Sequence, residues 1–185
     1  VDELTELGVR ATFQAADFTD PDAVRTLADA VRSWSDGLDL LLNNAGGLFQ
    51  ENTRVGPGIE ITFYVNHLAP YLLTAHLLDH LNTDARIITT ASAAHRGSAL
   101  ALDRVRGDNS LSGMNAYSHS KLANVLFASE LARRLDARGR AITSNSVHPG
   151  FIPGSDFWRF MPGPLSFLFR ALGLMPGTST VDDGA

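Results

Sequence analysis

The sequence predicts an α/β fold in which helices cover both faces of a doubly wound parallel sheet. Short apolar runs, which are typical of buried parallel strands, alternate along the chain with longer segments whose apolar residues recur at helical spacing. Such alternation favours strand–helix–strand units. Polar or glycine residues follow four expected strands, and sites in parallel sheets lie at those ends. With 185 residues, the chain suits one domain, 1–185.

The individual elements follow from apolar spacing and from the signals at element ends. A helix begins at Asp20 and Pro21, because Asp caps a first turn and Pro suits the first helical position, and it stops before Gly37. The last expected helix ends in arginines, whose charge complements the helix dipole. Residues 93–114 are rich in Gly and Ser and indicate a loop. The expected strands are residues 9–16, 38–42, 86–91 and 141–147, and the expected helices are residues 21–36, 58–81 and 115–137.

Composition and charge narrow the classes of function. The net charge of −5 disfavours a nucleic-acid binder, which would need a basic surface. The chain has no cysteine, so disulfides and thiolate metal sites are excluded, and we expect a cytoplasmic location because the composition fits a reducing compartment. The six histidines show no metal-ligand spacing, and we expect no metal site. No apolar run reaches the roughly 20 residues of a membrane span, and the first residues do not resemble a signal peptide.

Tyr117 and Lys121 lie four positions apart in the expected helix 115–137, so they share one helix face. A cation beside a tyrosine favours the phenolate and lowers the pKa of the phenol from about 10 toward neutral. Such a phenol can act as a general acid or base. The same spacing also arises by chance in solvent-facing pairs, so the pair by itself leaves both interpretations open.

Two further polar residues fall where such a site would need them. Ser92 directly follows the expected strand 86–91, and a hydroxyl there can hydrogen-bond a substrate oxygen beside the phenol. Asn66 lies inside the expected helix 58–81, and Asn is an unfavourable residue in a helix interior. A buried or functional role would explain Asn66. The plain alternatives are a serine that starts a loop and a tolerated polar position.

Together these residues resemble a known family in their order and approximate spacing. The motif Asn43-Asn44-Ala45-Gly46, followed by Asn66, Ser92, Tyr117, Lys121 and Pro149-Gly150, is similar to the signature of short-chain dehydrogenases/reductases. The segments VNHLAPYLLT, AYSHSKLANVLFASELARRL and NSVHPG look most like the branch with retinol dehydrogenases, WW-domain oxidoreductases and light-dependent protochlorophyllide reductase. The resemblance covers nearly the whole chain and implies a Rossmann-type sheet.

The resemblance implies an NAD(P)-dependent oxidoreductase that moves hydride between nicotinamide and an alcohol or carbonyl. Tyr117 would be the acid/base at the substrate oxygen, and Lys121 would lower the pKa of Tyr117 and hold the nicotinamide ribose. Ser92 would orient the substrate oxygen, and Asn66 would hold a water in a proton relay. The small-molecule substrate would be apolar, because residues 151–175 are rich in aromatic residues and would form a lid.

The same resemblance implies a dinucleotide cofactor, NADP or NAD, with NADP favoured. Asp17 would contact the adenine, and Tyr117 and Lys121 would meet the nicotinamide half. The other cofactor-lining residues would be Asn43, Ala45 and Gly46 on the adenine-ribose side and Pro149, Gly150 and Ile152 at the nicotinamide.

One part of the family pattern is absent from the sequence. No G-x-x-x-G-x-G run follows a strand, and the family places this pyrophosphate loop upstream of the position of Val1. The chain also begins without Met, in what looks like the end of a helix. We therefore expect a sequence truncated at its N-terminus, and at its C-terminus as well, that lacks the first βαβ unit. The strand 9–16 would then have no neighbour, and these 185 residues alone would be inactive.

Two other classes of protein remain open. NAD(P)-dependent sugar epimerases and dehydratases share the Tyr-x-x-x-Lys spacing, although the motif at residues 43–46 speaks against them. A non-catalytic dinucleotide-sensing protein on the same fold would tend to lose Tyr117 or Lys121, and both are present. Residues 151–175 also fit a membrane-surface segment. The oligomeric state is open, a homo-oligomer included.

Overall fold

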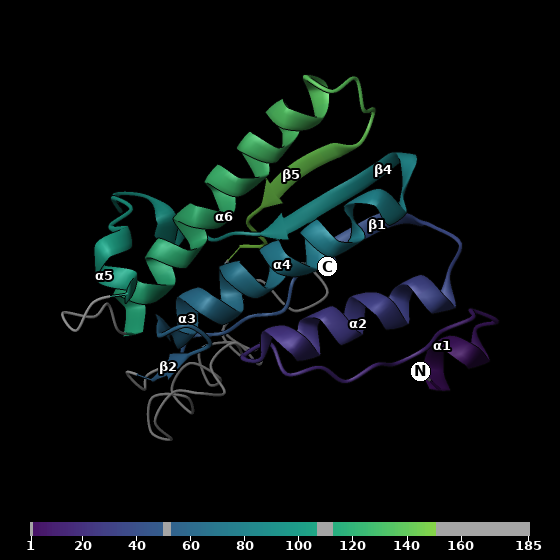
Figure 1. Ribbon diagram of the computed structural model, residues 1–185, viewed down its shortest axis with the longest axis horizontal. Helices are drawn as coiled ribbons and strands as arrows, with labels where there is room; N and C mark the ends of the chain where they lie inside the picture. Colours follow the sequence, from purple (N-terminus) through teal and green to yellow (C-terminus); the bar gives the residue numbers. More distant parts are fainter. Residues whose placement is uncertain (1, 50–52, 107–112, 151–185) are drawn as a thin grey trace, which may run out of the picture.

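A computed structural model describes residues 2–49, 53–106 and 113–150, and it builds them around a parallel sheet (Figure 1). The strands of this sheet, in spatial order, are β1 (Leu38–Asn43), β4 (Leu81–Thr90) and β5 (Thr143–Val147). Leu41 of β1 pairs with Ile87 of β4 in the parallel register. The predicted α/β class and its parallel sheet are confirmed.

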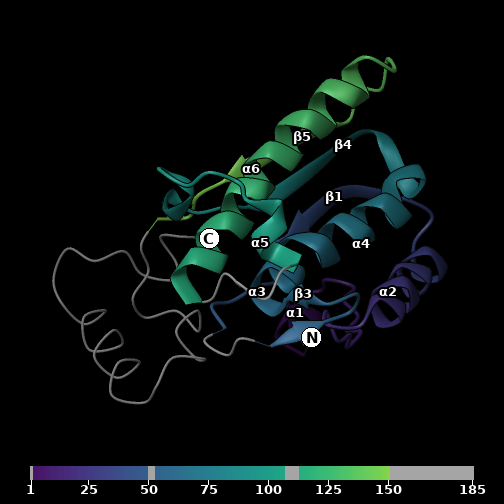
Figure 2. The ribbon, with the colours of Figure 1, turned by 60° about the vertical axis from the view of Figure 1, so that its left-hand side comes forward.

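Helices and one hairpin connect these strands. The hairpin pairs β2 (Arg54–Val55) with β3 (Ile59–Glu60) in antiparallel fashion. The helical elements are α1 (Asp2–Glu6), α2 (Pro21–Trp34), α3 (Ile61–Phe63), the π turn η1 (Tyr64–Leu68), α4 (Ala69–Leu77), the 3₁₀ turns η2 (Leu78–His80) and η3 (Ala93–His95), α5 (Leu102–Arg106) and α6 (Gly113–Asp136). The long helix α6 packs against β5 and β4, and α2 packs against α4 (Figure 2).

The two faces of the sheet differ in burial. Leu41 and Ile87 point into the core, which also contains Leu77 of α4. Their strand neighbours Leu40 and Leu42 point the other way and are 53% and 55% exposed. Because successive strand side chains alternate between faces, the described helices bury one face and leave apolar side chains open on the other.

The helix expected from Asp20 and Pro21 is confirmed as α2. The carboxylate of Asp20 accepts a hydrogen bond from the backbone N–H of Asp22 over 2.9 Å, and Pro21 occupies the first turn. Val24 and Ala28, which lie four residues apart, are fully buried and join the core. Three further predicted elements are present, with ends shifted by at most a few residues: the strands at 38–42 and 141–147 and the helix at 115–137. The strand predicted from residue 86 begins earlier, at Leu81.

The strand predicted for residues 9–16 is wrong. These residues form no ladder with any described strand, and the side chain of Phe13 is 77% exposed. Their local composition suits a strand, but a strand exists only when a neighbour supplies hydrogen bonds to its backbone groups. The segment instead lies against α2, where the guanidinium of Arg10 is 5.3 Å from the ring centroid of Trp34.

The helix predicted for residues 58–81 begins later than expected and is interrupted by a π turn. Its first residues form β3, and the carboxylate of Glu60 then caps the following turn by accepting from the N–H of Phe63 over 2.8 Å. The π turn η1 follows and contains Asn66. Single π turns within α-helices occur frequently at functional sites. The expected loop 93–114 also contains the short helices η3 and α5, which apolar spacing did not indicate.

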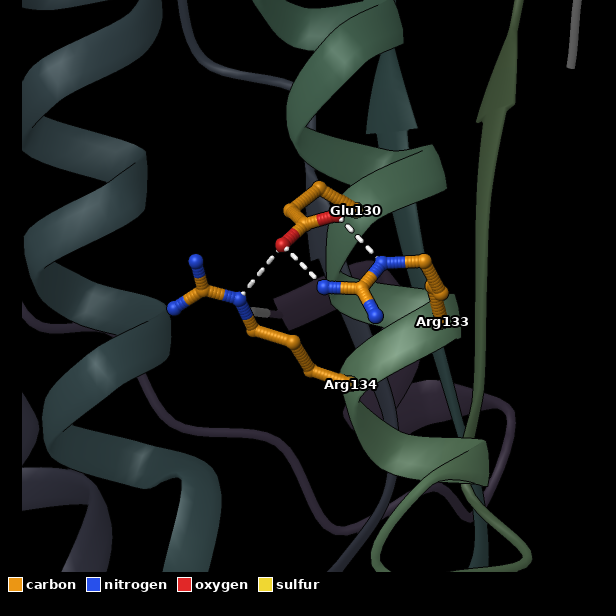
Figure 3. A network of polar contacts seen from close by, with 3 residues as sticks. All are labelled: Glu130, Arg133 and Arg134. Carbon is orange, nitrogen blue, oxygen red and sulfur yellow. Dashed lines mark hydrogen bonds and ion pairs between the residues drawn. The ribbon is translucent and has the colours of Figure 1, made fainter.

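The last turns of α6 carry a surface ion-pair cluster of Glu130, Arg133 and Arg134 (Figure 3). The carboxylate of Glu130 accepts from Arg133 over 2.8 Å and from Arg134 over 2.7 Å. These two guanidinium groups lower the pKa of Glu130 to about 2. The cluster is exposed to solvent. None of the helices that the structure describes combines the length and apolar character that a membrane crossing requires.

Candidate active site

The shared helix face of Tyr117 and Lys121 points into the protein. Both residues lie in the first half of α6, and their side chains are only 8% and 5% exposed. The ammonium nitrogen of Lys121 is 5.5 Å from the centroid of the Tyr117 ring. This burial excludes a solvent-facing pair. It places a phenol and an amine, two groups that carry protons, next to the ends of the parallel strands.

The ammonium of Lys121 is held by a backbone oxygen at the end of β4. Its Nζ donates to the carbonyl of Thr90 over 2.8 Å. Burial lowers the pKa of Lys121 from 10.5 to about 8, because removal from water disfavours the charged amine. Lys121 is also the only lysine in the sequence, so it is the only ammonium side chain that the chain can bring to this site.

Ser92 joins the pair from the strand end, as the sequence predicted. It follows β4, its Oγ accepts from the N–H of Ala94 over 3.3 Å, and its side chain hydrogen-bonds the phenol of Tyr117. The expectation that the pKa of Tyr117 lies below its ordinary value is wrong for this structure. Burial raises the pKa of Tyr117, and the hydrogen bond with Ser92 offsets only part of that rise.

Asn66 is the most constrained of the predicted catalytic residues. It is 1% exposed, and its side-chain amide pairs with both backbone groups of Gly47 over 2.9 Å. The amide also donates to Oγ of Ser120, which in turn donates to the carbonyl of Tyr117. Asn66 thus links the loop after β1 to the helix turn that carries the phenol. Its predicted role in holding a relay water stays a prediction.

A glycine is required beside this amide. A Cβ atom on Gly46 would lie 2.7 Å from Oδ1 of Asn66, which is too close for a real contact. The predicted glycine therefore has a structural reason that the sequence motif did not reveal. It lets the loop after β1 approach η1 closely enough for the pairing of Asn66 with Gly47.

The remaining predicted cofactor residues that the structure describes lie at the ends of two strands, β1 and β5. Asn43 ends β1, is buried and donates from Nδ2 to Thr74 of α4 over 2.9 Å, and Ala45 is exposed in the loop that follows. Pro149 and Gly150 follow β5, and Gly150 has a φ of 95°, a conformation that favours glycine. Ile152 and residues 151–175 lie outside the described residues.

Asp17 stands apart from the other predicted residues in its contacts. Its exposed carboxylate accepts from the N–H and the hydroxyl of Thr19, each over 2.8 Å, and the bond to the backbone lowers its pKa. These bonds are local and precede α2. Within the described ranges, no three acidic or histidine side chains gather in a way that could hold a metal ion.

Asn124 and His67 belong to this site and escaped the sequence analysis. Asn124 lies three positions after Lys121 and seven after Tyr117, so all three occupy one face of α6. Its amide bonds to the carbonyl of Thr90 and to the ring of His67. The helical spacing between Tyr117 and Asn124 was the signal in the sequence that could have identified Asn124.

Comparison with known proteins identifies the family. The family model described as short chain dehydrogenase matches residues 1–160. The chain belongs to the short-chain dehydrogenase family. Its relatives include retinol dehydrogenase 11 from Homo sapiens, 36% identical over 83% of this chain, and dehydrogenase/reductase SDR family member 13 from Bos taurus, 40% identical over 86%.

The solved structures of short-chain dehydrogenases agree with this assignment. A short chain dehydrogenase from Burkholderia cenocepacia in complex with NADP has a TM-score of 0.72 at 30% identity, over 100% of this chain and 70% of its own. A blue fluorescent protein from a metagenomic library in complex with NADPH has a TM-score of 0.65 at 31% identity, over 85% of this chain and 59% of its own. The predicted Rossmann-type fold and the family are therefore confirmed.

The chain spans half or less of the length of the curated short-chain dehydrogenases that it matches. It covers 50% of retinol dehydrogenase 11 and 42% of family member 13.

Proposed function

We propose that the protein is an NAD(P)-dependent oxidoreductase that interconverts an alcohol and a carbonyl compound. The buried Tyr117–Lys121 pair, with Ser92 hydrogen-bonded to the phenol, carries the proposal. A merely structural role would not call for this combination of a buried phenol, a buried amine and a hydroxyl at one strand end. They suit proton transfer to or from an oxygen atom of a substrate.

The residues around Lys121 fit a nicotinamide cofactor. An ammonium group has three N–H donors, and within the described residues one of them is used by Thr90. The others are free for ribose hydroxyls. A bound nicotinamide would supply the hydride that adds to the carbonyl carbon, or would accept the hydride that leaves the alcohol carbon. Asn43 ends β1, Gly46 follows β1 and Gly150 follows β5, so all three lie at carboxyl ends of strands in one parallel sheet, where dinucleotides bind in such folds.

Tyr117 provides the proton in the direction of reduction. Burial raises the pKa of Tyr117, which favours the protonated phenol over the phenolate. As the carbonyl carbon gains hydride, its oxygen takes the Tyr117 proton and becomes the alcohol oxygen. The resulting phenolate is stabilised by the Lys121 ammonium and regains a proton from solvent. Ser92 keeps the reacting oxygen next to the phenol.

The substrate class we propose is an apolar alcohol or aldehyde, with NADPH as the preferred reductant. Relatives at 36% and 37% identity are named retinol dehydrogenases, and two solved relatives are described as complexes with NADP or NADPH. The aromatic residues within 151–175 would supply an apolar cover. Each methylene buried by such a cover favours binding by about 0.8 kcal/mol.

The test is a steady-state assay of reduced-nicotinamide consumption by the protein encoded by the complete open reading frame of this sequence. All-trans-retinal and a homologous series of aliphatic aldehydes are compared with NADPH and NADH. We expect kcat/KM to rise with chain length and to be higher with NADPH. No consumption of either cofactor with any carbonyl would refute an oxidoreductase, and a flat aldehyde series would refute the apolar substrate.

A further inference from the structure

Asn124 joins three elements of the candidate site through one side-chain amide. Its Nδ2 donates to the carbonyl of Asn66 in η1 and to the carbonyl of Thr90 at the end of β4, each over 3.1 Å. Asn124 itself lies in α6 and is 2% exposed. An amide nitrogen carries two hydrogens, so these two bonds use both of them.

The orientation of this amide is fixed by His67. Oδ1 of Asn124 lies 3.0 Å from Nδ1 of His67, so the ring donates a proton to the amide oxygen. A flipped amide would place its oxygen against two carbonyl oxygens and its NH₂ against the ring donor. The imidazole is itself held between Phe63 and Phe127 by edge contacts at 5.2 and 6.1 Å. Burial lowers the pKa of His67, which favours the neutral ring, and the contact of Nδ1 with the amide oxygen selects the Nδ1–H form.

The Thr90 carbonyl is the point at which this amide meets the reactive pair. That oxygen accepts from Nζ of Lys121 over 2.8 Å and from Nδ2 of Asn124 over 3.1 Å. A carbonyl oxygen has two lone pairs, and both are engaged here. Without Asn124, the carbonyls of Thr90 and Asn66 would each lose a partner, and the Thr90 carbonyl that holds the ammonium would be less fixed.

We propose that Asn124 is a positioning residue that holds the Lys121 ammonium in place through the Thr90 carbonyl, with His67 setting the orientation of the Asn124 amide. The inference rests on the proposed function, because a fixed ammonium matters when Lys121 binds the cofactor and supports Tyr117. Asn124 touches neither the substrate nor the reacting atoms in this account. Its contribution is to keep η1, β4 and α6 in one arrangement around the amine.

The central experiment replaces Asn124 by Leu, which has the same branching and number of side-chain heavy atoms and no donors. Leu135→Ala serves as the matched control, since Leu135 is a buried core residue of the same helix and lies far along α6 from Lys121. Both variants lose stability, but only the first removes the bond to Thr90. His67→Phe provides a second variant if Asn124→Leu does not fold, because it keeps an aromatic ring between Phe63 and Phe127 and removes the donor.

The direct readout is the exchange of the Lys121 ammonium protons with water, measured by NMR on the protein of the complete open reading frame labelled with ¹⁵N-lysine. The Lys121 signal is assigned by its loss in Lys121→Met. We expect exchange to accelerate at least tenfold in Asn124→Leu and by a smaller factor in His67→Phe. We expect Leu135→Ala to stay within twofold of the original chain.

The kinetic readout is kcat/KM for the cofactor in the protein of the complete open reading frame. We expect at least a tenfold loss in Asn124→Leu and less than a twofold change in Leu135→Ala at a temperature where both are folded. Unchanged ammonium exchange, or faster exchange with unchanged kcat/KM, would overturn the proposal. An unmodified protein without any activity would refute the proposed function, and the exchange rates would still decide whether Asn124 holds the amine.

Discussion

The ammonium nitrogen of Lys121 lies 2.8 Å from the carbonyl oxygen of Thr90. This contact joins the helix that carries the phenol to the strand that leads into Ser92. It also holds a charged amine where almost no water reaches it, which is why the pKa of Lys121 falls to about 8. Burying this charge lowers the stability of the fold, and substitution of Lys121 can measure that loss.

Lys121→Met should make the protein more stable and less able to bind NADPH. The fold lowers the pKa of Lys121 from 10.5 to about 8. Each pKa unit corresponds to about 1.4 kcal/mol, and the lost hydrogen bond to Thr90 subtracts about 1 kcal/mol. We expect the free energy of unfolding at pH 7 to rise by about 2 kcal/mol in urea titrations. A large drop in the free energy of unfolding would show that burial of the ammonium does not destabilise the fold.

The same pair of proteins tests the pH dependence. Between about pH 8 and 10.5, the unfolded chain binds a proton at Lys121 that the folded chain has released, so the stability of the unsubstituted protein rises with pH. Lys121→Met lacks this linkage. We therefore expect its stability advantage to shrink as the pH rises from 8 to 10. A constant difference across this range would contradict the lowered pKa of Lys121.

Tyr117→Phe should abolish turnover and leave cofactor binding nearly unchanged. Phe retains the ring beside Lys121 and removes only the hydroxyl that Ser92 contacts. General acid–base groups contribute roughly 10²–10⁴-fold to rate, so kcat should fall by about that factor. Cofactor titration followed by fluorescence provides the control. Retention of more than about a tenth of the original kcat would exclude Tyr117 as the acid.

Gly46→Ala should destabilise the fold through Asn66. The added Cβ would lie 2.7 Å from Oδ1 of Asn66 and would break the pairing of that amide with Gly47. We expect a loss of about 1–3 kcal/mol in the free energy of unfolding. In an Asn66→Ala background the clash is gone, so the same substitution should cost much less. Additive losses in this double-mutant cycle would contradict the contact.

The exposed apolar face of the sheet should make the 185-residue chain associate with copies of itself. Leu40 and Leu42 are 53% and 55% exposed on that face, and contiguous exposed apolar surface promotes association. The double substitution of both leucines by Thr should lower the binding of an anilinonaphthalene dye and raise the monomer fraction in sedimentation. Leu126→Thr, on the exposed side of α6, is the matched control. An equal effect of the control would exclude the sheet face as the cause.

Local patterns in the sequence were sufficient for the elements whose signals are short-range. Asp20 and Pro21 predicted the start of α2, and the spacing of Tyr117 and Lys121 predicted their common face on α6. The strand ends followed from apolar runs, which placed Ser92 and the loop after Asn43 at one edge of the sheet. Each of these depends on neighbours within a few residues, which the sequence displays directly.

Tertiary structure decided the features that need distant partners. Residues 9–16 have the composition of a strand, but none of the described strands pairs with them, and the π turn at Asn66 divides a segment whose sequence predicts one helix. The sign of the pKa shift at Tyr117 depends on burial, which outweighs its hydrogen bond with Ser92. The bond from Asn124 to Thr90 spans 34 residues of sequence, so only the packing of α6 on β4 brings its two ends together.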